Sequence, residues 1–321
     1  MENTGGKNAV TSAIEHPSSY DAMEYYCRKT GKEMRVVPAN HETGGIDPDE
    51  VVKYIDQDTC LLSIMAASNI SGTIMDLEEI ARRARQINPD IYILGEIWHN
   101  ALPWLRGDEF DAVMNYPFKD ATLAFVKGGD ARTAAHDIMR ICEHYPAPAL
   151  HVLMNFMSTH DTVRAITAIA GESCEGRDRY WQSARRLTPE QYENGRRLMT
   201  LAYAMIFTLP GIPSIYYGDE IGMQGYKDPF NRAFFDWESR ETRIRPVLQN
   251  LAALRKSCPA FADGTLAVTQ AQGGVLCYER RAEAAVAAVC INRTEQQVRT
   301  VLLGRTVEVQ PCSFAVVTDP E

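Results

Sequence analysis

The sequence has few of the features that mark an exported, membrane-spanning or zinc-binding protein. Its eight cysteines are scattered, and no two of them have a C-x-x-C spacing. This disfavours a zinc site and is typical of reduced, mostly buried thiols in a cytosolic protein. The longest apolar stretch, Leu198 to Tyr217, is interrupted by Pro210, Gly211 and Pro213. A membrane span is therefore not expected.

Positive charge is also scarce. The formal net charge is -9, and no run of Lys and Arg residues stands out. This argues against an electrostatic grip on nucleic acid, and an acidic surface suits a neutral substrate such as a sugar. The first residues, 1–8, are polar and lack the basic-then-apolar order of a secretory signal. We expect a cytoplasmic protein without a nucleic-acid or membrane partner.

Helix and strand patterns alternate over the first ninety residues, which predicts an α/β architecture. Residues 20–30 have a helical pattern and residues 34–39 a strand pattern. The nearly continuous apolar run 59–67 predicts a strand that is buried on both faces. Asp76, with Glu79 three residues later, marks the start of a further helix. The apolar residues of that helix fall on one face: Leu77, Ile80, Ala81, Ala84 and Ile87.

A second series of predicted strands begins after residue 88, and each strand ends in polar or acidic residues. These strands are expected at 91–96, 112–116, 151–161 and 212–220. Residues 198–209 have helical spacing of their apolar side chains and lie between the last two strands. In a parallel α/β barrel, chemistry occurs at the carboxyl ends of the strands. The polar residues expected there are Glu96, Asn115, His160, Asp161, Asp219 and Glu220.

The pattern changes after about residue 242. A helix near 245–255 is followed by short strand-like runs separated by polar turns. Such a pattern predicts a small antiparallel β domain. The strand-like runs are 275–279, 285–291, 298–303 and 313–317.

Two of the strand ends carry the residue types that glycoside hydrolysis requires. That reaction needs a carboxylic acid to protonate the leaving oxygen and a second carboxylate at the oxocarbenium centre. Glu96 ends an apolar strand and is followed by Trp98 and His99, so we expect it to be partly desolvated. His160 and Asp161 offer an imidazole donor beside a carboxylate, which suits vicinal sugar hydroxyls. Taken alone, Glu96 is more typical of a surface ion pair than of a catalytic acid, and Asp161 is more typical of a helix N-cap than of a sugar site.

Three segments, which occur in the same order as in a known family, favour the interpretation as a glycosidase site. Residues 88–118, 155–164 and 207–232 resemble the α-amylase family, glycoside hydrolase family 13, and most of all its neopullulanase and cyclomaltodextrinase branch. The resemblance covers residues 86–321. It implies a retaining hydrolase of α-glucans such as maltodextrins, cyclodextrins and pullulan. The roles it implies are general acid/base for Glu96, transition-state stabilisation for Asp161, a sugar-hydroxyl ligand for His160, and substrate subsites for Trp98, His99 and Arg232.

The same resemblance implies a partial (β/α)8 barrel made of strands five to eight. The family's nucleophilic Asp, with an Arg two residues before it, belongs to strand four, and no such pair occurs upstream of Glu96. Asp111, Asp219 or a carboxylate from a second chain are candidate replacements. Because loss of a nucleophile removes most of the rate, we expect poor or no activity. A homodimer is left open.

The first part of the chain resembles a different family. Residues 10–18, 45–50 and 61–74 are similar to the middle of a cysteine desulfurase or other class V aminotransferase. This implies that His16 stacks on a pyridoxal phosphate ring and that Asn69 contacts the phenolic oxygen of that cofactor. The Schiff-base Lys of that family comes later in its sequence, where this chain has already changed. We therefore expect no bound cofactor, and His16 and Asn69 as structural remnants.

These resemblances predict three domains and leave three hypotheses. Residues 1–85 form an aminotransferase-like α/β fragment, 86–242 half of an α-amylase-type barrel, and 243–321 a C-terminal β-sandwich domain. The first hypothesis is an α-glucan hydrolase impaired by the missing nucleophile region. The others are an inactive fused or truncated chain that at most binds oligosaccharide, and a pyridoxal phosphate enzyme. No metal site is predicted.

Overall fold

A computed structural model describes residues 5–68, 70–107 and 109–320. The chain divides into two compact units. The first unit comprises Met1–Leu94 and Trp104–Asp111, and the second comprises Gly95–Pro103 and Ala112–Glu321. The assignment of three domains, at 1–85, 86–242 and 243–321, stays a prediction.

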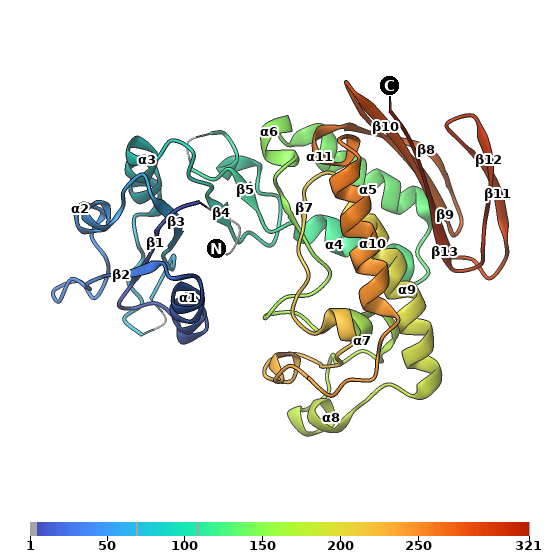
Figure 1. The fold of residues 1–321 in the computed structure, drawn as a ribbon. Coiled ribbons are helices and arrows are strands. Elements are labelled where there is room, and N and C mark those ends of the chain that lie inside the picture. The colour runs from blue at the N-terminus through green and yellow to red at the C-terminus, as the bar shows by residue number, and fades with distance from the viewer. Residues whose placement is uncertain (1–4, 69, 108, 321) are drawn as a thin grey trace. The chain divides into compact units, whose positions relative to one another are not determined.

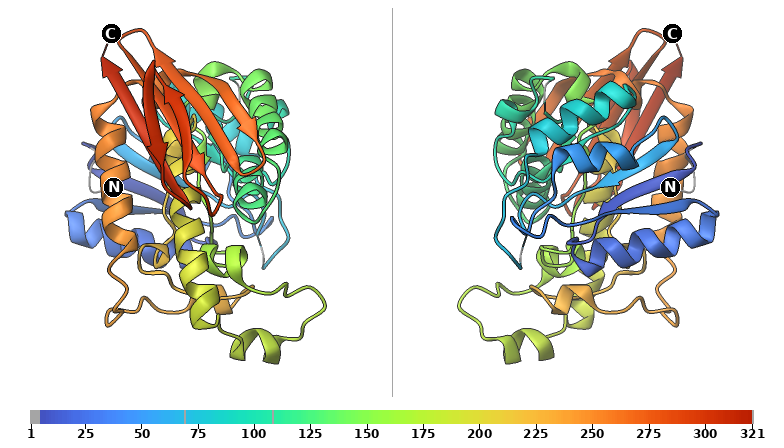
Figure 2. Two further views of the ribbon diagram at one scale, coloured as in Figure 1. Left: turned by 90° about the vertical axis from the view of Figure 1, so that its right-hand side faces the viewer. Right: turned by 90° about the vertical axis from the view of Figure 1, so that its left-hand side faces the viewer.

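The first unit is built on a three-stranded parallel sheet with the order β2-β1-β3. The strands are β1 (Asn8–Ser12), β2 (Glu33–Val37) and β3 (Thr59–Ser63). β1 is buried along its whole length because it lies between the other two. Helices α1 (Pro17–Thr30) and α3 (Leu77–Ile87) lie on opposite sides of the sheet (Figures 1 and 2). The predicted α/β alternation of this part is confirmed.

Local signals in this unit explain its helices. The side chain of Asp76 accepts a hydrogen bond from the backbone N–H of Glu79 at 3.1 Å, which caps α3 as predicted. The face of α3 predicted to be apolar is buried at Ile80, Ala81 and Ala84. A shorter helix, α2 (Pro48–Val51), continues as a 3-10 turn.

The prediction for β3 was wrong in one respect. The strand was expected to be buried on both faces, but most of its residues are only partly buried and Leu61 is exposed. The reason is its place in the sheet, since β3 pairs with β1 alone. A continuous apolar run does not tell an edge strand from a central one.

Four short strands, of which all but the first residue belong to the second unit, are neighbours in chain order. They are β4 (Leu94–Gly95), β5 (Ala112–Val113), β6 (Met154–Asn155) and β7 (Ile212–Pro213). β4 pairs with β5, a bridge joins Met114 to Met154, and β6 pairs with β7 in parallel. Sequential order is what a (β/α) barrel requires. All four strands are shorter than predicted, because the polar residues after them already belong to loops.

Helices separate these strands. The longest, α9 (Pro189–Thr208), begins with a capping box formed by Thr188 and Gln191 and is buried over most of its second half. This confirms the helix predicted at 198–209. No helix in the described ranges is long and apolar enough to cross a membrane. The other helices are α4 (Tyr116–Val126), α5 (Ala131–His144), α6 (Ala147–Leu150), α7 (Ala165–Ala170), α8 (Arg179–Ala184), α10 (Ile244–Ser257) and α11 (Ala260–Asp263).

The end of the chain forms the predicted antiparallel β domain (Figure 2). One sheet has the order β13-β10-β9-β8, and a separate hairpin joins β11 to β12. Cys277 and Cys290 of the sheet and Leu302 and Val309 of the hairpin share one core. The strands are β8 (Thr265–Gln272), β9 (Val275–Ala282), β10 (Ala285–Asn292), β11 (Val298–Leu302), β12 (Arg305–Val309) and β13 (Ser313–Pro320). Strands β8 and β12 were not predicted, because most of their residues are exposed or only partly buried and form no continuous apolar run.

A buried arginine on β9 connects the β domain to α9. Arg280 is fully buried and donates hydrogen bonds to the carbonyl of Thr208 at 2.6 Å and to that of Gly264 at 2.9 Å. Burial, with the nearby Arg255, lowers the pKa of Arg280 to about 10, so the side chain is still charged at pH 7. Its hydrogen bonds compensate for the desolvation of this charge.

We predict that Arg280→Ala destabilises the protein by about 2 to 4 kcal/mol, because two buried carbonyls lose their donor and a cavity remains. Urea denaturation followed by circular dichroism measures this. The matched control is Arg281→Ala at the next position, where the side chain is 54% exposed and pairs with Glu279. That change should alter the free energy of unfolding by less than about 0.5 kcal/mol. Equal effects of the two changes would contradict the role given to Arg280.

Candidate active site

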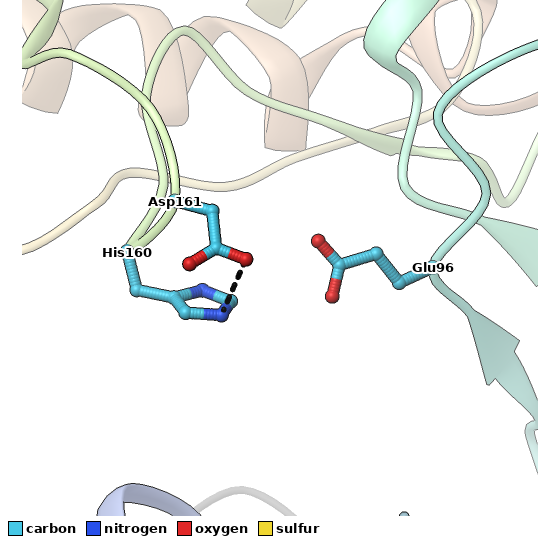
Figure 3. Close-up of side chains that lie close together, drawn as sticks. All are labelled: Glu96, His160 and Asp161. Carbon is cyan, nitrogen blue, oxygen red and sulfur yellow. Dashed lines mark ion pairs between the residues drawn. The ribbon is translucent and has the colours of Figure 1, made fainter. Parts of the chain in front are cut away.

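Three of the predicted site residues come together in the second unit. Glu96 follows β4, and His160 and Asp161 lie in the loop after β6. One side-chain ligand atom from each of the three lies within 4.8 Å of the others. The Asp161 carboxylate points toward the Glu96 carboxylate, with the His160 ring beside it (Figure 3). The His160 Nε2 atom is 3.4 Å from the Asp161 carboxylate.

Glu96 is oriented by a tyrosine that sequence reasoning missed. The hydroxyl of Tyr116 donates a hydrogen bond to Glu96 Oε1 at 2.7 Å. The Tyr116 ring is buried, and the Trp98 ring stacks on it with centroids 4.2 Å apart. Burial, together with this bond to Glu96, raises the pKa of the Tyr116 hydroxyl, so it remains a donor at neutral pH. Its position directly after Asn115 at a predicted strand end was the available signal.

The expected desolvation of Glu96 was wrong. The side chain is exposed, because β4 ends at Gly95 and Glu96 already lies in the loop. Trp98 is 52% exposed and covers Tyr116 rather than the carboxylate. The site therefore holds Glu96 by a hydrogen bond and not by burial in an apolar pocket.

The loop with His160 and Asp161 is held by backbone contacts. The buried Asn231 donates hydrogen bonds to the carbonyls of His160 at 2.7 Å and Thr162 at 2.8 Å. The backbone N–H of Asp161 donates to the Thr159 hydroxyl at 3.2 Å. The N-cap of the next helix, α7, is Arg164. The alternative interpretation of Asp161 as a helix N-cap was therefore wrong.

Arg232 joins the same site through Asp161. Its Nη2 atom donates to Asp161 Oδ1 at 2.8 Å, and its Nε atom donates to the His160 carbonyl at 2.9 Å. Arg232 also pairs with Asp228 at 3.0 Å. One histidine and two carboxylates are residue types that bind metals. Here both carboxylates already accept hydrogen bonds, from Tyr116 and from Arg232, and the Arg232 guanidinium places a positive charge beside Asp161.

The remaining predicted residues lie outside this cluster. His99 is exposed, three residues after Glu96. His16 belongs to the first unit, is exposed, and accepts hydrogen bonds at its carbonyl from the first turn of α1. Asn69 lies outside the described residues. The interpretation of His16 and Asn69 as remnants of a pyridoxal phosphate site therefore stays a prediction.

Two further strand-end residues have structural roles. Asn115 caps α4 by accepting a hydrogen bond from the backbone of Phe118, and its amide donates to Asn155 at 2.8 Å. Asp111, a candidate nucleophile, belongs to the first unit, where it pairs with Arg85 at 3.0 Å and accepts from the Ile93 backbone N–H at 2.7 Å. Both oxygens of Asp111 are therefore occupied.

The other candidate nucleophile, Asp219, is part of a buried network. Its side chain is completely buried, and its Oδ2 atom accepts hydrogen bonds from the hydroxyls of Ser158 at 2.5 Å and Tyr203 at 2.6 Å. Its Oδ1 atom lies 3.8 Å from Nη1 of the buried Arg164. A side chain without exposed surface cannot reach a substrate, so Asp219 is excluded as the nucleophile.

Comparison with known sequences identifies the family. The profile of the α-amylase catalytic domain matches residues 48–259, more than half of the 321 residues. The chain belongs to the α-amylase family. The match begins at residue 48, within the segment predicted to resemble a class V aminotransferase. The comparisons give that second resemblance no support.

Individual α-amylase relatives are consistent with this result. The cyclomaltodextrinase of Geobacillus thermopakistaniensis is 35% identical over 224 residues, which are 68% of this chain and 34% of that protein. Neopullulanase 2 of Thermoactinomyces vulgaris is 33% identical over 232 residues, 70% of this chain and 35% of that protein. The chain therefore spans about a third of the length of these curated relatives.

A solved structure shows the same fold. The cyclic α-maltosyl-(1→6)-maltose hydrolase of Arthrobacter globiformis, in complex with maltose, superimposes with a TM-score of 0.69 and 26% identity. The alignment covers 85% of this chain and 59% of that one. The fold is therefore that of an amylase-type barrel segment followed by an antiparallel β domain.

The buried carboxylate predicts a pH effect on stability. Burial raises the pKa of Asp219 from 3.8 to about 6, so the folded state binds this proton more tightly than the unfolded state. The resulting stability is present below about pH 4 and is lost as the pH rises through about 6. We predict that the stability difference between the native protein and Asp219→Asn falls by about 2 kcal/mol from pH 4 to 6.5. Urea denaturation across this range measures it, and a constant or rising difference would contradict the assignment.

Proposed function

We propose that the second unit carries the acid/base half of an α-glucan hydrolase site. Glu96 acts as the general acid/base, Asp161 stabilises positive charge at the reacting carbon, and His160 binds a sugar hydroxyl. The observation that carries this proposal is the approach of the two carboxylates from different strand ends to within 4.8 Å. Their position at the carboxyl ends of barrel strands supports it.

The surroundings suit a neutral oligosaccharide. Trp98 presents a half-exposed ring beside Glu96, and aromatic rings with a few polar groups are typical of small-molecule sites. His99 and Arg232 complete the proposed subsites. The names of the relatives, cyclomaltodextrinase and neopullulanase, support maltodextrins, cyclodextrins and pullulan as the substrate class. A cytoplasmic location, suggested by the free cysteines, and a choice between monomer and homodimer belong to the same proposal.

Hydrolysis by this chain is expected to be weak. A retaining mechanism needs a nucleophilic carboxylate. Of the two candidates in the chain, Asp219 is buried and Asp111 is engaged by Arg85 and a backbone N–H. The cluster of three around Glu96 includes no further carboxylate among the described residues.

A second candidate function is oligosaccharide binding without hydrolysis by a fused chain. Two observations favour it: Arg232 holds Asp161 at 2.8 Å, and the first unit has the strand order β2-β1-β3. Barrel strands are neighbours in chain order, so the order β2-β1-β3 is not that of a barrel segment and favours a separate origin for this sheet. A pyridoxal phosphate enzyme is the least favoured function, since the segment that carries the Schiff-base Lys in that family has no match here.

We predict that the protein releases p-nitrophenol from p-nitrophenyl maltoside very slowly and without a burst. The reason is that no positioned nucleophile forms a glycosyl intermediate. Any residual release of glucose or maltose from β-cyclodextrin should disappear in Glu96→Gln, because this leaving group requires protonation. The control is Glu175→Gln, an exposed loop carboxylate of the same unit. Rapid turnover with a burst would show that a nucleophile is present after all.

We also predict that Trp98→Ala weakens binding of β-cyclodextrin at least about tenfold, because the ring beside Glu96 is lost. Isothermal titration calorimetry measures this without requiring hydrolysis. Trp237→Ala is the matched control, since Trp237 is 88% exposed and its ring contacts Phe235, with centroids 4.6 Å apart and the planes tilted by 59°. If the two changes have the same effect, or if the native protein does not bind, the proposed sugar site is wrong.

A further inference from the structure

The segment from Ser158 to Arg164, here named the 158–164 arch, carries His160 and Asp161 between two buried ends. At its first end, the Ser158 hydroxyl donates a 2.5 Å hydrogen bond to Asp219 Oδ2. Ser158 is 2% exposed, whereas His160 and Asp161 are exposed. The arch therefore rises from the interior to the site within two residues.

The second end of the arch returns to the same carboxylate. Arg164 is fully buried, and its Nη1 atom lies 3.8 Å from Asp219 Oδ1. Its guanidinium lies over the rings of Tyr216 and Tyr217, at 4.4 and 4.5 Å from their centroids, and donates to the Tyr217 carbonyl. Both ends of the arch thus face one aspartate, 61 residues after Ser158 in the sequence.

We propose that Asp219 is a positioning residue for His160 and Asp161. By binding the Ser158 hydroxyl with one oxygen and facing the Arg164 guanidinium with the other, it determines where the 158–164 arch stands opposite Glu96. A buried hydrogen bond to a charged acceptor is stronger than one in water, so the loss of either end loosens the exposed residues between them. The sugar-binding consequence rests on the proposed function, whereas the consequence for the arch does not.

Tyr203 provides an internal control. Its hydroxyl donates to the same Asp219 oxygen as Ser158, at 2.6 Å compared with 2.5 Å. Tyr203 belongs to α9 and not to the arch. Ser158→Ala and Tyr203→Phe therefore each remove one donor from the same atom, but only Ser158→Ala frees an end of the arch. A purely stabilising role of Asp219 would make the two changes equivalent.

The test is hydrogen–deuterium exchange measured by mass spectrometry on the full chain without ligand. The arch contains three amides bonded within it, those of Thr159, Asp161 and Thr162. We expect peptides covering residues 156–164 to exchange at least about tenfold faster in Ser158→Ala and in Asp219→Asn. In Tyr203→Phe the same peptides should change less than about twofold. Peptides from β9 and β10 report whether each variant is folded.

A calorimetric titration with maltose adds a second measurement. Ser158→Ala should weaken maltose binding about five- to tenfold, with Tyr203→Phe close to the native protein. If the arch exchanges faster but maltose binding does not change, Asp219 positions the arch, and the proposed sugar site is wrong. Equal exchange of the arch in Ser158→Ala and Tyr203→Phe, or no acceleration in Ser158→Ala, would overturn the role of Asp219.

Discussion

The buried carboxylate of Asp219 is the contact on which the second unit's site depends. It accepts hydrogen bonds from the loop after β6 and from α9, and it faces Arg164 at the start of α7. A charge without solvent contact is tolerated only where donors surround it. The 158–164 arch and α9, which are distant in the sequence, are thereby held at one point next to the exposed pair His160 and Asp161.

The two carboxylates of the proposed site, those of Glu96 and Asp161, are exposed. Glu96 accepts one hydrogen bond from Tyr116, and Asp161 accepts one from Arg232. A site at strand ends needs buried supporting residues and exposed carboxylates, because substrate has to reach the carboxylates while their geometry stays fixed. Membership in the α-amylase family does not by itself guarantee turnover. In the described part of the chain, the cluster of Glu96, His160 and Asp161 contains no third carboxylate.

Much of the fold and the core of the site were predictable from local patterns. The capped helix at Asp76, the helix over 198–209 and the β domain all follow from spacing and caps. The motifs around Glu96 and Asp161 also identified the two carboxylates. What escaped prediction were partners from other segments, namely Tyr116, Ser158 and Arg164. Each of them forms a hydrogen bond with a residue 20 to 61 positions away in the sequence. Local periodicity does not reveal such contacts.

The sequence by itself determined the family, the two carboxylates and the strand ends on which they stand, because those depend on residue type and short spacing. Only the tertiary structure decided that Asp219 is a buried anchor, that Glu96 is exposed and that β3 is an edge strand. Each of these depends on which distant segment packs against a residue. The physical reason is that burial and hydrogen-bond partners are set by long-range packing, whereas propensity and capping act within one or two turns of the chain.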